Sequence, residues 1–110
     1  MQLERGDIGV LYGNLLDNAI EACRKVPEGK RFIRLENKYQ FGKLLLVITN
    51  SKTMEKNENL KTTKKDSYSH GRGILSVQRV AEKYNGTAGF TDKGEVFEAS
   101  VILYGIEVKK

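Results

Sequence analysis

The most informative segment of this chain is residues 14–22, which read Asn-Leu-Leu-Asp-Asn-Ala-Ile-Glu-Ala. If the segment is helical, Asn14 and Asn18 lie on one face, one turn apart. Asparagine is unfavourable inside a helix, so two on one face need a reason. An amide oxygen can complete the coordination shell of a phosphate-bound Mg²⁺, and an amide nitrogen can donate to phosphate. The pattern predicts a magnesium–phosphate site or, on a simpler interpretation, two solvated surface amides.

The segment belongs to a longer amphipathic helix, predicted over residues 7–25. Asp7 is placed to be its N-cap, and Pro27 follows its end. A second amphipathic helix is predicted over residues 73–84 and is closed by Gly86, which suits a left-handed backbone position. The two apolar faces have i, i+3, i+4 spacing and consist of Ile8, Leu11, Leu15, Leu16, Ala19, Ile20 and Cys23 in the first helix and Ile74, Val77, Val80, Ala81 and Tyr84 in the second.

Four strands are predicted between and after these helices. Residues 31–39 alternate and indicate a half-buried strand, which forms a hairpin with the continuously apolar residues 44–49. That second strand is expected to be central and covered on both faces. Residues 87–91 and 95–104 form the other hairpin. The order predicts an α/β fold, a two-layer sandwich of a mixed, mainly antiparallel sheet with helices on one face.

A polar segment without periodicity covers residues 51–70 and predicts a functional lid. It ends in residues 70–73, His-Gly-Arg-Gly, where the second helix is expected to begin. Gly71 and Gly73 would let the backbone approach a ligand, and a helix start offers unpaired N–H groups to an anion. The preceding Thr-Thr-Lys-Lys at 62–65 supplies hydroxyl and ammonium groups for phosphates. A plain loop-to-helix junction is the alternative interpretation.

Asn50 stands at the end of the central strand, at the mouth of this lid. Polar residues in such a place often contact a ligand, and the Asn50 carbonyl oxygen could accept a hydrogen bond from the amino group of adenine. The alternative is an asparagine that only forms a turn.

Composition narrows the class of protein. The chain has 110 residues, enough for one domain, and a net charge of +5. Its basic residues are mixed with acidic ones and lack interleaved aromatic residues, which argues against a nucleic-acid-binding domain. The longest apolar run, Leu44–Ile48, is far shorter than the roughly 20 residues of a membrane span. Because Cys23 is the single cysteine, an internal disulfide is excluded. Its side chain is expected to be buried.

These motifs, in this order, resemble those of the GHKL ATPase superfamily, which includes gyrase, a heat-shock chaperone ATPase, histidine kinases and the MutL repair protein. Residues 14–18 resemble the N-box, residues 48–51 occupy the position of the first glycine box, and residues 70–73 resemble the second. The similarity is closest to the sensor histidine kinases of the peptide quorum-sensing, accessory gene regulator type. The resemblance covers residues 7–101 and implies the Bergerat ATP-binding fold, with residues 1–110 as one catalytic domain that is truncated at its N-terminus.

The resemblance implies roles for individual residues in binding ATP and Mg²⁺. Asn18 would be the main metal ligand, and Asn14 would contact phosphate or the metal shell. Asn50 would take the place of the aspartate that reads adenine. Contacts to the triphosphate from the lid and its junction with the helix would come from Thr63, Lys64, His70, Gly71, Arg72 and Gly73.

Two departures from the superfamily pattern affect this assignment. Asn50 stands where an aspartate is usual, and Lys52 stands where a glycine is expected, so adenine affinity should be weakened. Members that hydrolyse ATP have a glutamate at the position of Asn14. An amide cannot act as a base, which favours the kinase branch and catalysis by positioning and charge neutralisation.

The resemblance also implies a protein context. The acceptor histidine would lie on a separate dimerisation domain rather than at His70, and a response regulator would be an indirect partner in two-component signal transduction. The parent would be a membrane-bound homodimer with this domain in the cytoplasm, and the fragment a monomer that binds no nucleic acid. Two alternatives remain: an anti-sigma-factor serine kinase and a non-catalytic interaction module that has lost nucleotide binding.

Overall fold

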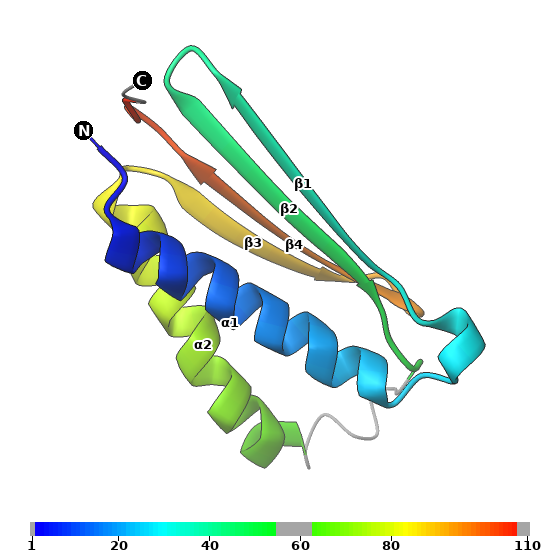
Figure 1. Ribbon diagram of the computed structural model, residues 1–110. Coiled ribbons are helices and arrows are strands. Elements are labelled where there is room, and N and C mark those ends of the chain that lie inside the picture. The colour runs from blue at the N-terminus through cyan, green and yellow to red at the C-terminus, as the bar shows by residue number, and fades with distance from the viewer. Residues whose placement is uncertain (1, 55–62, 108–110) are drawn as a thin grey trace.

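The computed structural model describes residues 2–54 and 63–107; for residues 63–72 it describes the course of the backbone only. Its elements, in chain order, are α1 (Arg5–Arg24), a 3-10 turn (Glu28–Lys30), β1 (Ile33–Gln40), β2 (Lys43–Ser51), α2 (Thr63–Lys83), β3 (Thr87–Asp92) and β4 (Val96–Leu103). The strands form one sheet in the order β1-β2-β4-β3, and each neighbouring pair is antiparallel. Both helices lie on one face of this sheet (Figure 1). The predicted two-layer fold is therefore confirmed.

The hydrophobic core lies between the helices and the central strands. Leu11, Leu15 and Ala19 of α1 are buried against Leu46 and Ile48 of β2, as the i, i+4 spacing predicted. A second set of buried residues comes from α2 and β4, and it consists of Val77, Val80, Ala81, Tyr84, Ala99, Val101 and Leu103. Burial of these side chains is the main force that orients both helices.

The central strand is covered on one face only, so the prediction of cover on both faces was wrong. Leu46, Ile48 and Asn50 point to the helices and are buried, whereas Leu45 and Val47 point to the open face and are partly exposed. An apolar run does not reveal whether its second face is covered. The residues of β4 that are paired with Leu45 and Val47 on this face, Ile102 and Ser100, are also only partly buried.

The prediction for β1 needs a similar correction, because all eight of its residues are exposed. Ile33 and Leu35 do point to the helix side, but they keep 40% and 39% of their surface accessible. β1 is the edge strand of the sheet, and α1 packs chiefly on its neighbour β2. The alternation of apolar and polar residues therefore identified the strand and its two faces correctly, but it did not predict how far the strand is buried.

The helix boundaries differ from those predicted. α1 begins at Arg5 with Glu4 as its N-cap residue, so Asp7 lies inside the first turn and is not the cap. α2 begins at Thr63 and not at Gly73. Residues 63–72 contain no proline, and lysine and arginine favour helix, so Gly71 and the following Gly73 cost stability without ending the helix. The predicted lid overlaps this helix, and residues 55–62 lie outside the described residues; the lid stays a prediction.

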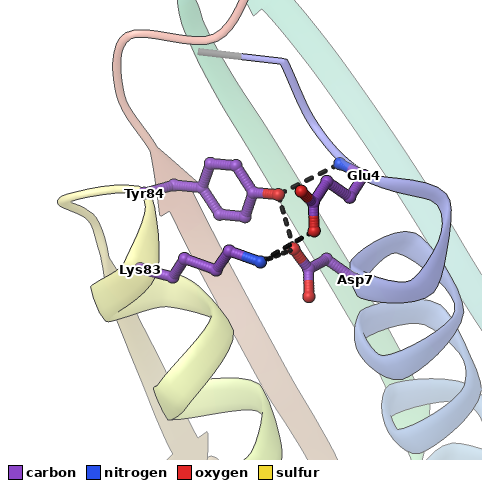
Figure 2. Close-up of polar contacts among 4 residues, drawn as sticks. All are labelled: Glu4, Asp7, Lys83 and Tyr84. Carbon is purple, nitrogen blue, oxygen red and sulfur yellow. Dashed lines mark hydrogen bonds and ion pairs between the residues drawn. The ribbon is translucent and has the colours of Figure 1, made fainter.

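A polar network joins the start of α1 to the end of α2 (Figure 2). The buried Tyr84 hydroxyl donates to the Asp7 carboxylate over 2.5 Å and accepts from the Glu4 backbone N–H over 3.0 Å. Lys83 lies 2.9 Å from both Glu4 and Asp7. The hydrogen bond from Tyr84 has the largest effect on the pKa of Asp7, and the hydrogen bond from Lys83 has the second largest. Both lower this pKa below its usual 3.8. Burial, followed by the bond to Asp7, raises the pKa of Tyr84.

This network predicts how stability depends on pH. Because folding lowers the pKa of Asp7, its carboxylate stabilises the folded state at pH values above 3.8. This stabilisation is lost as the pH falls through the lower pKa of the folded state. We expect Asp7→Asn, which cannot ionise, to reduce the free energy of unfolding by about 1 kcal/mol at neutral pH. Urea titrations at several pH values should show this difference closing below pH 3.8. Glu4→Gln is the control, since that carboxylate is 68% exposed and its ion pair should contribute little.

The turn after α2 uses its two residues differently from the prediction. Asn85, not Gly86, has the left-handed backbone, with φ of 61°. Asparagine tolerates this conformation better than most residues. Gly86 is needed for a different reason, because a Cβ atom there would lie 1.7 Å from the Ile102 carbonyl oxygen. This close approach lets β3 start directly beside β4.

Candidate functional site

The two helices approach each other closely at Asn14 and Gly73. A Cβ atom on Gly73 would lie 3.0 Å from Oδ1 and 3.5 Å from Cγ of Asn14. Asn14 Nδ2 donates to the Val10 carbonyl oxygen over 2.8 Å, which directs Oδ1 towards α2. The fold therefore brings together two residues that the sequence analysis selected separately, 59 positions apart (73 − 14). Glycine permits this contact because it has no side chain to separate the helices.

Asn18 lies one turn further along the same face of α1 and is partly buried. Its side chain makes no hydrogen bond to another residue within 2–54 or to a described side chain of α2. A half-buried amide without an internal partner keeps both its oxygen and its nitrogen for a ligand. One neutral oxygen is a suitable protein contribution to a Mg²⁺ ion that takes its other ligands from phosphates and water. The residues present therefore fit the predicted metal role.

Asn50 is the polar residue at the end of β2 on the helix side of the sheet, and it is only 3% exposed. Its Nδ2 donates to the Ser51 carbonyl oxygen over 2.9 Å, so its Oδ1 is the group left to accept from a ligand. Ser51 Oγ lies 3.4 Å from the Cys23 sulfur of α1. Cys23 is buried, as predicted. These contacts place the end of β2 beneath the last turns of α1.

Lys52 has a role that the sequence analysis missed. Its ammonium group donates to the Gly94 carbonyl oxygen over 2.7 Å and lies 3.1 Å from the Asp92 carboxylate. Its backbone N–H donates to the Glu95 carbonyl oxygen over 3.0 Å. The lysine that replaces the expected glycine therefore fastens the chain leaving β2 to the turn between β3 and β4. A partner in a turn 42 residues away (94 − 52) gives no local signal in the sequence.

The remaining predicted contacts are not tested by the structure. The side chains of Thr63, Lys64, His70 and Arg72 lie outside the described residues, and so do the surroundings of Gly71. One expectation is corrected: Gly73 lies inside α2, so the unpaired N–H groups of a helix start are not found there. Within residues 2–54 and 63–107, no group of three His, Cys, Asp or Glu side chains could hold a metal ion.

The contact between Asn14 and Gly73 leads to a prediction. In Gly73→Ala, the new methyl group displaces the Asn14 amide by a few tenths of an ångström or breaks its bond to Val10. We expect ligand affinity to fall about three- to tenfold, roughly 1 kcal/mol, while the helix gains intrinsic stability. Calorimetric titration with ATP measures this loss.

Two controls separate this effect from a general helix effect. Gly9→Ala adds the same methyl group to α1 with no atom within 4 Å, so its affinity should not change. In an Asn14→Ala background, Gly73→Ala should have no further effect, because the displaced group is gone. Equal losses in both backgrounds would contradict the proposed coupling.

Comparison with known proteins identifies the family and the fold. Residues 3–104 match the family model described as GHKL domain. Among solved structures, the Acinetobacter baumannii histidine kinase AdeS matches with a TM-score of 0.64 at 16% sequence identity. The match covers 94% of this chain and 48% of that one, so the chain spans about half of its structural neighbour. At this identity the likeness concerns the fold alone. No curated protein sequence matched. No helix in the described part of the chain is long and apolar enough to cross a membrane.

Proposed function

The chain belongs to the GHKL domain family, and on that premise we propose that it binds ATP with Mg²⁺ between α1 and α2. In the whole protein, we propose, this domain transfers the γ-phosphoryl group to a histidine on a separate dimerisation domain. ATP binding is general among GHKL domains. The phosphotransfer rests on the fold shared with a histidine kinase and on the chemistry of the residue at position 14.

The observation that carries the proposal is that Asn14 and Asn18 share one face of α1 and that Gly73 of α2 contacts Asn14. The first two provide amide groups on one face of α1, and the third lets α2 pass within contact distance of that face. A polyphosphate here would meet the amide oxygens and nitrogens of Asn14 and Asn18, which do not repel it as carboxylates at these two positions would. Amides suit a ligand whose own charge is neutralised by a metal.

The reaction type follows from what Asn14 can and cannot do. An amide does not take up a proton at neutral pH, so Asn14 cannot activate water as a general base. Its oxygen and nitrogen can still orient a phosphate group or a metal-bound water. Bound Mg²⁺ would supply neutralisation of the charge on the phosphates, and Asn18 would be its protein ligand. Positioning without a base favours transfer to a protein nucleophile over hydrolysis.

The adenine end of the nucleotide is assigned to Asn50. Its amide nitrogen is already bonded to Ser51, which leaves Oδ1 to accept a hydrogen bond from the amino group of adenine. Because this acceptor is neutral, the bond should be weaker than one to a carboxylate. Asn50→Asp should therefore tighten ATP binding if Asn50 reads adenine.

A titration of ATP with and without Mg²⁺ tests the proposal. We expect the chain to bind ATP, with an affinity about 5- to 150-fold higher when the metal is present, the usual range for coupled ligands. An unchanged affinity after chelation would refute the metal role. Absence of any binding would favour the competing proposal, a non-catalytic interaction module. The structural role of Lys52, which binds the turn at Gly94, is also compatible with that proposal.

The wider context is part of the proposal. The parent would be a membrane-bound homodimer in a two-component system, with a response regulator as its downstream partner and a peptide quorum signal as its input. Mixing this chain with a histidine-bearing dimerisation domain and ATP should give acid-labile phosphate on that domain. Acid-stable phosphate on serine would point instead to an anti-sigma-factor serine kinase.

A further inference from the structure

The hairpin between β1 and β2 exposes an aromatic side chain that no part of the described structure covers. Phe41 is 96% accessible, whereas Leu75, the next most exposed large apolar side chain among those described, is 53% accessible. Phe41 has φ of 51° and Gly42 has φ of 77°. Both central residues of the turn are thus left-handed, a position that favours asparagine, aspartate or glycine. Phenylalanine here costs both backbone strain and exposed apolar surface, which suggests a function outside the folded domain.

The hairpin is held in place and is not a loose loop. The Gly42 carbonyl oxygen accepts from the Ile106 N–H over 2.9 Å, and the Tyr39 hydroxyl donates to the Ile106 carbonyl oxygen over 2.6 Å. Ile106 itself is buried. The turn is at the far end of β2 from Asn50, about 23 Å from it at the usual rise per residue. Whatever Phe41 contacts is therefore separate from the proposed nucleotide site (Figure 1).

A shallow hollow of about 380 Å³ lies beside Phe41, and its other walls are Gln40, Lys43 and Tyr104. The two aromatic residues provide apolar walls. The amide, the ammonium group and the phenol hydroxyl can each donate a hydrogen bond to an anionic oxygen. A phosphate ester next to an acyl chain could contact both the aromatic rings and the hydrogen-bond donors.

On the open face of β1 and β2, basic residues outnumber acidic ones. By strand alternation, Arg34, Lys38 and Lys43 share the open face of the sheet, where Glu36 is the acidic residue of β1. Lys38 and Lys43 have no ion-pair partner within the described side chains. The whole chain also has a net charge of +5. A basic face attracts an anionic surface, and two copies of it would repel each other.

We propose that this hairpin end of the open sheet face docks on an anionic phospholipid membrane. Phe41 enters the interface, and Gln40, Lys43 and Tyr104 receive a headgroup phosphate. Aromatic residues flanked by lysine are typical of protein segments at the membrane–water interface. A ring as exposed as that of Phe41 suits a deformable lipid layer better than a preformed protein groove. The proposal is independent of the nucleotide site.

Vesicle co-sedimentation tests the proposal. We expect the 110-residue chain to bind vesicles that contain phosphatidylglycerol, to bind pure phosphatidylcholine vesicles poorly, and to dissociate as salt is raised. Phe41→Asn should lower the partition coefficient about tenfold or more without loss of stability, since asparagine suits the turn. Lys43→Glu should lower it by about the same factor.

Matched variants make the result specific. Leu75→Gln removes the next most exposed apolar residue, and Lys30→Glu makes the same charge change beyond the other end of β1; neither should reduce binding as much. The chain has no tryptophan, so Phe41→Trp gives a single tryptophan, which can be excited selectively and whose emission should shift to the blue on vesicles. Equal losses for Lys30→Glu and Lys43→Glu would overturn the proposal. So would inorganic phosphate competing fully with vesicles, or a Phe41-dependent dimer without vesicle binding.

Discussion

Gly86→Ala should lose a large part of its folding stability. The added Cβ atom would lie 1.7 Å from the carbonyl oxygen of Ile102, 2.7 Å from its carbonyl carbon and 3.0 Å from the Cα atom of Leu103. All three atoms belong to the backbone of β4, so no side-chain rotation relieves the clash. Overpacked positions usually cost 1–3 kcal/mol even when side chains can move, and we expect more than about 3 kcal/mol here. That is a large part of the roughly 5–15 kcal/mol that stabilises a domain.

The surrounding hydrogen bonds explain why the backbone cannot simply move apart. The Gly86 N–H donates to the Ala81 carbonyl oxygen over 2.7 Å, and the Tyr104 N–H donates to the Tyr84 carbonyl oxygen over 3.1 Å. Moving β4 away would break this connection to α2 and open the core around Tyr84.

Circular dichroism and urea unfolding measure the effect. Gly89→Ala is the matched control in the same strand region, because its Cβ atom would meet only Ser100 Oγ, at 3.5 Å. It should remain folded, with a change of less than about 1 kcal/mol. A Gly86→Ala protein as stable as Gly89→Ala would show that the β3–β4 junction is far more adaptable than this packing implies.

Much of the fold follows from the sequence because its local signals agree with one another. The i, i+4 spacing identified the buried residues Leu11, Leu15, Ala19 and Cys23, and all four strands were placed within a few residues. The burial of each side chain could not be predicted in the same way. Ile8 and Ile20 lie on the predicted apolar face, yet they are 38% and 43% exposed.

The candidate site was predictable in its parts but not in its contacts. Asparagines four residues apart must share a helix face, so the arrangement on α1 required only local geometry. The approach of Gly73 to Asn14 depends on how α1 and α2 cross, which no local pattern specifies. The same holds for Lys52 with Gly94, and for Asp7 with Tyr84: each pair joins segments that meet only after the sheet has formed. Sequence reasoning treated Lys52 as a departure and Asp7 as a cap for that reason.

Asn18→Ala is expected to remove the magnesium-dependent part of ATP binding. If Asn18 is the protein ligand of the metal, its loss should weaken ATP binding in Mg²⁺ by about 100-fold, since loss of groups that only orient metal ligands already costs 10–100-fold. Without Mg²⁺, wild type and variant should bind ATP equally weakly. This convergence distinguishes a metal ligand from a residue that contacts the nucleotide directly, because a direct contact would be lost in both conditions.

The variant is informative because it should not disturb the fold. The Asn18 side chain has no hydrogen bond to a described side chain, and alanine is the more favourable helix residue, so the unfolding midpoint should stay equal or rise slightly. Asn37→Ala is the control for removing an amide: Asn37 accepts from the Tyr12 hydroxyl on the β1 side of α1, and its loss should leave Mg²⁺-dependent affinity unchanged. If Asn18→Ala keeps the full response to Mg²⁺, the metal is held by other groups. The amide-based site on α1 would then have to be abandoned even if ATP still binds.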